Sequence, residues 1–172
     1  MPPDNVFGIV GWKNSGKTTL VEALVRELTR RGFRISTIKH AHHAFDIDVP
    51  GKDSYRHREA GAQEVLVASG RRWALMHELH DESEPSLEAL LARLSPCDLV
   101  LVEGFKRDSH AKIEILRAAG PEGRIADSDP AICAIATNDP ALAKGHVHLP
   151  LDDIDAIADF ICTHRGLARH GA

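Results

Sequence analysis

The amino-acid sequence predicts an α/β protein of three layers, in which a mainly parallel sheet lies between helices and carries one antiparallel hairpin excursion. Short apolar runs alternate with stretches of helical periodicity along most of the chain. The first of these form a strand, a helix and a second strand, and a unit of this kind crosses over right-handed with its strands parallel. The loop that follows the first strand matches a phosphate-binding pattern.

The first strand covers residues 6–10, an apolar run typical of a strand buried on both faces of a parallel sheet. Residues 18–31 follow as a helix because leucines and a valine recur there at helical spacing, and Gly32 closes that helix. Residues 33–39 return as the second strand. Residues 40–53 are polar and have neither period, so they are expected to form a loop.

The remaining chain continues the alternation. Two β-like runs flank Gly70-Arg71-Arg72, a connection of hairpin length. We expect a short helix at 54–62, hairpin strands at 64–69 and 73–79, a helix at 85–94, strands at 98–102, 112–117 and 132–137, and a helix at 154–164. Residues 120–130 are expected to form one surface loop, and the end of the chain from about residue 166 is expected to fray.

Composition predicts a single cytoplasmic domain that is formed by residues 1–172. The chain has 172 residues and 43% hydrophobic content, which suffices for one core. A formal net charge of -4 gives no general attraction to nucleic acid or to an anionic membrane, and no apolar stretch approaches the ~20 residues that span a bilayer. Cys97, Cys133 and Cys162 form no CxxC pair, so we expect free thiols rather than disulfides or a thiolate zinc site.

A phosphate-binding loop of the P-loop NTPase type is predicted between the first strand and the first helix. Gly11 to Thr18 matches GxxxxGK[ST] at every fixed position. A loop of this length turns backbone N–H groups toward an anion at a helix N-terminus, while Lys17 supplies a point charge to the β- and γ-phosphates and the Thr18 hydroxyl binds Mg²⁺. The predicted nucleotide-binding residues are Gly11, Trp12, Lys13, Asn14, Ser15, Gly16, Lys17, Thr18 and Thr19.

Glu103 is the second expected Mg²⁺ ligand. It ends the apolar run DLVLVE, and ligands of open α/β sheets gather at the carboxyl ends of strands. Asp98 begins the same run and belongs at the opposite end of the strand, roughly 16 Å away, so it is a poor metal candidate. Lys17 and Glu103 are accordingly the two residues expected to support any hydrolysis.

The loop at 40–53 is rich in histidine and aspartate. Its carboxylates can organise Mg²⁺ and water, with Asp48 as the metal candidate, while its lysines face phosphate and its histidines bind a soft metal or a partner. A solvated polar loop is the alternative interpretation, and HxHH does not have the spacing of a structural zinc site. The residues concerned are His40, His42, His43, Asp46, Asp48, Lys52 and Asp53.

Asn138 and Asp139 follow a late apolar strand, where nucleotide-binding folds often recognise the base. An aspartate there can accept hydrogen bonds from N1–H and the N2 amine of guanine, which adenine does not offer. The alternative is a simple turn, because Asn-Asp-Pro has suitable turn chemistry. The residues alone favour neither.

Four segments together make the sequence resemble the MobB family of molybdopterin-guanine dinucleotide biosynthesis adapters. They are GWKNSGKTT, IKHAHHAFDIDVPGKDSYRHREAGA, VASGRRWALM and LVEGFKRDSHAKIEILR, and the resemblance covers nearly the whole chain. It implies a homodimeric P-loop protein that binds GTP with Mg²⁺, hydrolyses it weakly and assists the guanylyltransferase that joins GMP to molybdopterin. The family motifs fall on Gly11 to Thr19, His40 to Asp53 and Glu103 to Lys106.

Two further surfaces have expected roles under this resemblance. The hairpin at 64–79 is expected either to extend a sheet across the dimer or to be buried within one subunit. Lys106, Arg107 and Lys112 are the residues expected to meet anionic molybdopterin.

The alternative function is a small-molecule P-loop kinase. A kinase needs an acceptor pocket and a lid that carries arginines over the phosphates. The arginines available for this purpose are Arg56, Arg58, Arg71 and Arg72, which are equally suited to solvated helix and turn positions.

Overall fold

The computed structural model describes residues 4–41, 45–118 and 123–168 and confirms the α/β fold class. It divides into two compact units, one formed by residues 1–40 and 87–172 and the other by residues 41–86. The expectation of one domain over the whole chain stays a prediction.

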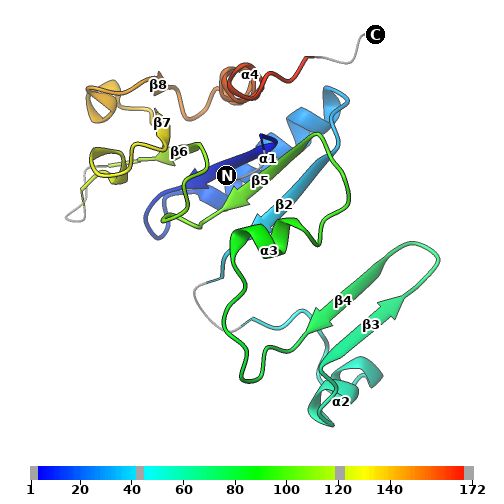
Figure 1. Cartoon of the computed structure of the whole chain (residues 1–172). Helices are drawn as coiled ribbons and strands as arrows, with labels where there is room; N and C mark the ends of the chain where they lie inside the picture. Colours follow the sequence, from blue (N-terminus) through cyan, green and yellow to red (C-terminus); the bar gives the residue numbers. More distant parts are fainter. Residues whose placement is uncertain (1–3, 42–44, 119–122, 169–172) are drawn as a thin grey trace. The chain divides into compact units, whose positions relative to one another are not determined.

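The larger unit is built on a six-stranded sheet with the order β2-β5-β1-β6-β7-β8, in which every described pair is parallel (Figure 1). Its strands are β1 (Val6–Val10), β2 (Ile35–Lys39), β5 (Leu99–Glu103), β6 (Lys112–Ile115), β7 (Ile132–Ala136) and β8 (His148–Leu149). Every residue of β1 and β5 is buried, which explains their uninterrupted apolar sequences.

Helices and short 3-10 turns cover the two faces of this sheet. Helices α1 (Lys17–Arg30) and α4 (Ile154–Arg165) pack on one face, where Phe7, Leu101 and Ile113 belong to the same core as Leu24 and Ile157. The other face meets α3 (Leu87–Leu91) and the 3-10 helices η1 (Ile125–Asp127) and η2 (Pro140–Ala143). The sheet therefore forms the middle of three layers, as predicted.

The smaller unit holds α2 (Asp53–Glu59) and the hairpin of β3 (Glu64–Ala68) and β4 (Trp73–His77). The strands pair antiparallel with Leu66 opposite Leu75. Ser69 closes the turn, since its backbone N–H and its hydroxyl both donate to the carbonyl oxygen of Arg72. The predicted antiparallel excursion is confirmed.

Several predicted boundaries differ from the structure. The helix expected at 85–94 covers only Leu87–Leu91, and the loop expected at 120–130 contains η1. Gly166 and Leu167 close α4 through backbone bonds to Thr163 and Cys162, while 169–172 lie outside the described residues. Within the part of the chain that is described, no helix is long and apolar enough to cross a membrane.

Candidate phosphate-loop site

Two glycines set the path of the loop between β1 and α1. Gly11 has a φ of 155°, and a Cβ atom there would lie 2.6 Å from Oγ of Ser15 and 2.8 Å from the carbonyl oxygen of Ile115. Gly16 has a left-handed φ of 97° and precedes the first residue of α1. Side chains at either position would strain or displace the loop, so the motif's glycines are explained by local geometry.

Lys17 lies back over this loop. Its Nζ donates to the carbonyl oxygens of Gly11 at 3.1 Å and Trp12 at 2.8 Å. Burial lowers the pKa of Lys17, as do the neighbouring charges of Lys106 and Lys39, while Glu103 opposes the shift. Three ammonium groups thus face one loop, an arrangement that suits a multiply charged anion such as a polyphosphate.

Thr18 and Glu103 meet where β1 and β5 end side by side. The parallel register places Glu103 opposite Ile9 of β1 and opposite Lys39 of β2. The hydroxyl of Thr18 donates to Oε1 of Glu103 at 2.9 Å, and Nζ of Lys39 lies 3.6 Å from the same oxygen. A hydroxyl and a carboxylate in contact are oxygen ligands of the kind that Mg²⁺ takes together with phosphate and water.

The remaining residues of the loop have different surroundings. Ser15 is buried, and its Oγ has no hydrogen-bond partner among the described residues. The ring of Trp12 lies 4.2 Å from Nζ of Lys106, and its Nε1 donates to the carbonyl oxygen of Gly123 at 2.8 Å. Asn14 has a positive φ of 62°. Lys13 and Thr19 are exposed.

Sequence reasoning missed Arg117 as part of this site. It follows β6, and its Nε donates to the carbonyl oxygen of Ser15 at 2.9 Å. Its guanidinium also lies where a side chain on Gly16 would need to pass. The contact joins residues 102 positions apart, so no local pattern indicates it.

The histidine- and aspartate-rich loop is divided between the two compact units. His40 belongs to the larger unit, where its ring lies 4.9 Å from that of Phe105 and its backbone N–H donates to the carbonyl oxygen of Glu103. His42 and His43 lie outside the described residues. The part of the loop from Phe45 onward belongs to the smaller unit.

Asp46 and Asp48 are engaged within the smaller unit. Both oxygens of Asp46 accept from Nη2 of Arg58 at 2.9 Å. The hydrogen bond from the backbone N–H of Asp48 lowers the pKa of Asp46 most, and the hydrogen bond from Arg58 lowers it further. Asp48 accepts from the Ser54 hydroxyl at 2.8 Å. Lys52 and Asp53 stand exposed where α2 begins. These bonds order the loop, and the expected metal role of Asp48 stays a prediction.

Asn138 and Asp139 follow β7 at the same edge of the sheet as the phosphate loop. The carboxylate of Asp139 accepts from the backbone N–H of Ala141 and caps η2, which is the turn chemistry expected of Asn-Asp-Pro. Asn138 instead contacts the chain after β8. Its Nδ2 donates to Oδ2 of Asp152 at 2.6 Å, and its Oδ1 accepts from the backbone N–H of Leu151.

The expectation that Lys112 meets molybdopterin was wrong. Its side chain is 0% exposed, and its Nζ donates to Oδ2 of Asp129 at 2.7 Å and to the carbonyl oxygens of Lys106 and Asp108. A buried ammonium needs partners of this kind, and here it ties the loop after β5 to the loop before β7. Lys106 and Arg107 stay candidates for an anionic ligand.

Comparisons with known proteins point to one family. The model of the family MobB, described as "Molybdopterin guanine dinucleotide synthesis protein B", matches residues 6–138. The chain is 44% identical over 161 residues to the molybdopterin-guanine dinucleotide biosynthesis adapter protein of Escherichia coli (strain K12), covering 91% of this chain and 90% of that protein. The adapter protein of the same name from Haemophilus influenzae is 42% identical over 158 residues, covering 91% of this chain and 86% of that protein.

Solved structures agree with these sequence matches. A crystal structure of molybdopterin-guanine biosynthesis protein B (mobB) superposes with a TM-score of 0.73 at 27% identity, over 94% of this chain and 99% of that one. The X-ray structure of a MobB homolog from Bacillus stearothermophilus superposes with a TM-score of 0.72 at 27% identity, over 95% and 99%. The predicted fold class is confirmed at the level of the whole chain.

Proposed function

The chain belongs to the MobB family, and from that premise we propose that it is an adapter of molybdopterin-guanine dinucleotide biosynthesis that binds GTP with Mg²⁺. In this role it assists the guanylyltransferase that joins GMP to molybdopterin. The observation that carries the nucleotide part of the proposal is the phosphate loop, with Lys17 over its carbonyls and Thr18 bonded to Glu103.

The residues around this loop fit a magnesium nucleotide. Lys17, Lys39 and Lys106 supply positive charge for phosphates, and the buried Ser15 hydroxyl still has bonding capacity. Thr18 and Glu103 would hold the metal. When bound, Mg²⁺ would offset the negative charge of the phosphates. We propose that hydrolysis is slow, because the sequence fixes no general base.

The family assignment supports the adapter and gives no support to the kinase alternative. One of the proposed lid arginines is also already engaged, since Arg58 donates to Glu78 at 2.9 Å and to Asp46 at 2.9 Å. Releasing it over a phosphate would break both ion pairs. We therefore retain the adapter as the single proposed function.

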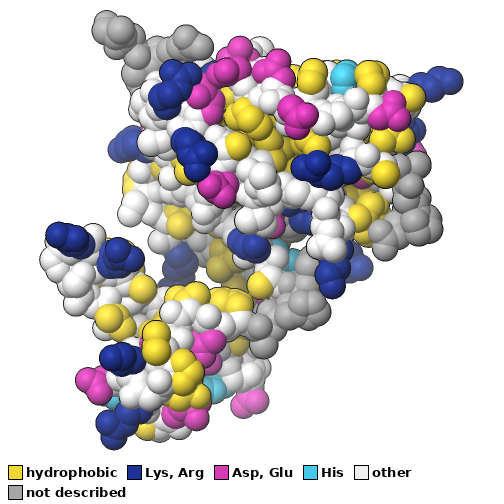
Figure 2. Space-filling model, turned by 180° about the vertical axis from the view of Figure 1, so that it is seen from behind, with side chains coloured by type: hydrophobic (Ala, Val, Ile, Leu, Met, Phe, Trp, Pro, Cys, Tyr) yellow, Lys and Arg dark blue, Asp and Glu magenta, His cyan; other side chains and the backbone are white. Residues whose placement is uncertain are grey.

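We propose that the protein acts as a homodimer in the cytoplasm and that the hairpin of the smaller unit forms the contact between subunits. Leu66, Trp73 and Leu75 share one face of the hairpin, and Leu66 and Trp73 are 61% and 66% exposed. Figure 2 shows hydrophobic side chains on the surface of this unit. Exposed apolar patches of this kind commonly mark protein contacts.

Reconstitution of the guanylyl transfer tests the proposed function. Purified guanylyltransferase, molybdopterin cofactor, GTP and Mg²⁺ are combined with no addition, with this protein, or with its Lys17→Ala variant. We expect this protein to raise the yield of molybdopterin-guanine dinucleotide and the variant to lose most of that effect. Equal yields in all three reactions would contradict the adapter role, and phosphorylation of a small acceptor would revive the kinase.

A further inference from the structure

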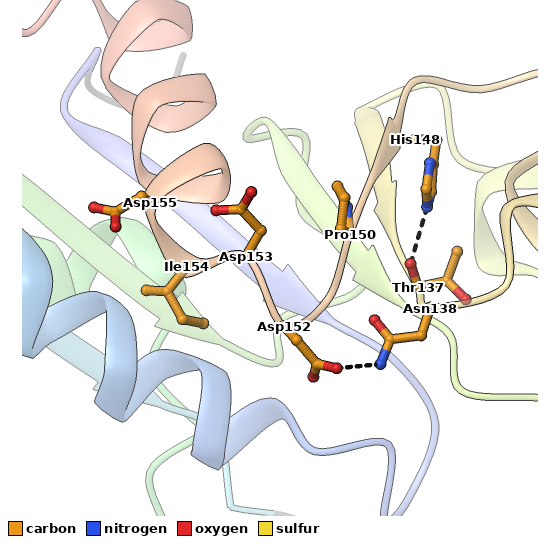
Figure 3. A pocket seen from close by; sticks show the side chains of 8 residues that line it. All are labelled: Thr137, Asn138, His148, Pro150, Asp152, Asp153, Ile154 and Asp155. Carbon is orange, nitrogen blue, oxygen red and sulfur yellow. Dashed lines mark hydrogen bonds between the residues drawn. The ribbon is translucent and has the colours of Figure 1, made fainter.

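A cavity of about 720 Å³ lies at the carboxyl ends of β7 and β8, outside the phosphate loop (Figure 3). Its volume falls in the range of roughly 300–1,000 Å³ typical of small-molecule sites. Its lining residues are Thr137, Asn138, His148, Pro150, Asp152, Asp153, Ile154 and Asp155. Of the three aspartates, Asp153 caps α4 and Asp155 accepts from Arg31. It therefore combines two apolar side chains with six polar ones, among which Asp152 makes its contact with Asn138.

The sheet places this cavity beside the phosphate loop. Strands β1, β6 and β7 are adjacent and parallel, so the segments after β1 and β7 leave the same edge of the sheet. Two strand spacings separate them, which is about 10 Å. A ribose and its α-phosphate bridge such a span, so a nucleotide held by its terminal phosphates at Lys17 would bring its base to the cavity.

The polar groups of the cavity are held in fixed positions. Asn138 links the segment after β7 to the segment after β8, because it donates to Asp152 and accepts from the backbone N–H of Leu151. His148 donates from Nε2 to the carbonyl oxygen of Thr137 at 2.9 Å. Figure 3 shows Asn138 and Asp152 facing one another across the gap between the two segments. Oδ1 of Asp152 has no hydrogen bond to any residue that the structure describes.

We propose that Asp152 is the carboxylate that recognises guanine in the nucleotide of this protein, with Asn138 as its positioning residue. The proposal rests on the proposed function, since it concerns the same nucleotide. Asp139 is the residue that sequence position favours, but its carboxylate caps η2 and it does not line the cavity. Asp152 lines the cavity and keeps an oxygen available.

The chemistry of the bases explains the selectivity. Guanine offers two neighbouring donors, N1–H and the N2 amine, to a carboxylate that can only accept. Adenine presents the N1 acceptor at that place, so its lone pair would face the carboxylate unpaired. Xanthine carries a carbonyl in place of the N2 amine, and an asparagine amide can donate to it where a carboxylate cannot.

Titration calorimetry with Asp152→Asn tests this assignment. GDP, XDP and ADP are titrated with Mg²⁺ into the wild-type protein, into Asp152→Asn, and into the controls Asp153→Asn and Asp139→Asn. Asparagine at 153 retains the cap of α4, so that control removes one of the other carboxylate charges that line the cavity and keeps the helix end. Melting curves verify that each variant is folded.

We expect Asp152→Asn to bind GDP about 10-fold or more weakly and XDP about 10-fold or more tightly than the wild type does. Asp139→Asn should bind all three nucleotides like the wild type, and Asp153→Asn should keep the wild-type preference for GDP over XDP. Asn138→Ala should lower the GDP-to-ADP affinity ratio while leaving ADP affinity, which depends on the phosphate loop, as it was. A switch to XDP in Asp139→Asn, or unaltered selectivity in folded Asp152→Asn, would overturn the assignment and leave the proposed function intact. A wild-type protein that binds no nucleotide would overturn both.

Discussion

At the scale of single residues, Glu103 is the residue whose position most directly supports the proposed Mg²⁺ site. It ends β5, accepts from the Thr18 hydroxyl at 2.9 Å and lies 3.6 Å from Nζ of Lys39. Glu103→Gln should fold normally but show weaker Mg²⁺-dependent nucleotide binding, because the amide removes one negative charge from the metal site. Calorimetry with and without EDTA measures that dependence.

Asp98→Asn is a suitable control for Glu103→Gln. Asp98 directly precedes the first residue of β5, at the end of the strand away from Glu103, and it accepts from the backbone N–H of Arg34. Its Mg²⁺ dependence should equal that of the wild type. If Glu103→Gln also behaves like the wild type, the metal ligand lies elsewhere, and Asp46 and Asp48 become the residues to substitute.

His110 makes stability depend on pH. The residue is 1% exposed, and neither ring nitrogen has a hydrogen-bond partner among the described residues. Burial, with help from Lys112 and Arg165, lowers its pKa from 6.5 to about 4. Between pH 6.5 and about 4 the unfolded chain binds a proton at His110 that the folded chain does not. The contribution of neutral His110 to the free energy of unfolding is therefore complete above pH 6.5 and is lost as the pH falls toward 4.

Urea unfolding at several pH values measures this effect. His110→Leu keeps an apolar side chain in the site and removes the titration, so its unfolding free energy should fall less between about pH 7 and about pH 5 than that of the wild type. The full difference over the window is on the order of 3 kcal/mol. His57→Leu, at an exposed position of α2, should retain the wild-type slope. Equal slopes for His110→Leu and wild type would contradict the account.

At the scale of elements, the sequence predicts what is determined locally. Strands β1 and β5 were predictable because strands buried on both faces are apolar throughout, and α1 because one face packs on the sheet. The phosphate loop is equally local, since its glycines and Lys17 lie within a few positions of one another. The hairpin followed from two β-like runs separated by a short connection with glycine.

Elements that depend on distant partners were missed. Strand β8 has two residues and η1 has three, too few to show a period. Buried Glu114 holds η1 by accepting from the backbone N–H groups of Ile125 and Ala126. Lysine and glutamate are mostly exposed in proteins, so nothing in the sequence indicates that Lys112 and Glu114 are buried. The contact of Asn138 with Asp152 joins residues 14 positions apart, so no local pattern indicates it.

The exposed apolar face of the hairpin is the proposed contact between subunits. Leu66→Asp places a charge on this face and should convert the proposed dimer into a monomer without unfolding the chain, because Leu66 is largely exposed. Sedimentation velocity measures the mass of the particle. Arg71→Asp, in the turn of the same hairpin, is the matched control and should stay dimeric. A dimeric Leu66→Asp protein would move the subunit contact away from this face.

At the scale of the whole molecule, the parallel order of the sheet brings separate segments to one edge. Lys17 follows the loop after β1, Glu103 ends β5, Arg117 and Asn138 follow β6 and β7, and Asp152 follows β8. These five residues lie at least 14 positions apart in the sequence. This arrangement accounts for a candidate nucleotide site that is assembled from short contributions of separate segments.

We propose above all that this site binds GTP in preference to ATP. Calorimetric titration with non-hydrolysable analogues of both nucleotides, each with Mg²⁺, tests this preference. Lys17→Ala is the variant expected to lose binding, and Arg26→Ala, which removes an exposed positive charge further along α1, is its control. We expect clear GTP preference, loss of binding in folded Lys17→Ala and near wild-type binding in Arg26→Ala. Preference for ATP, or a folded Lys17→Ala variant that binds as tightly as the wild type, would contradict it.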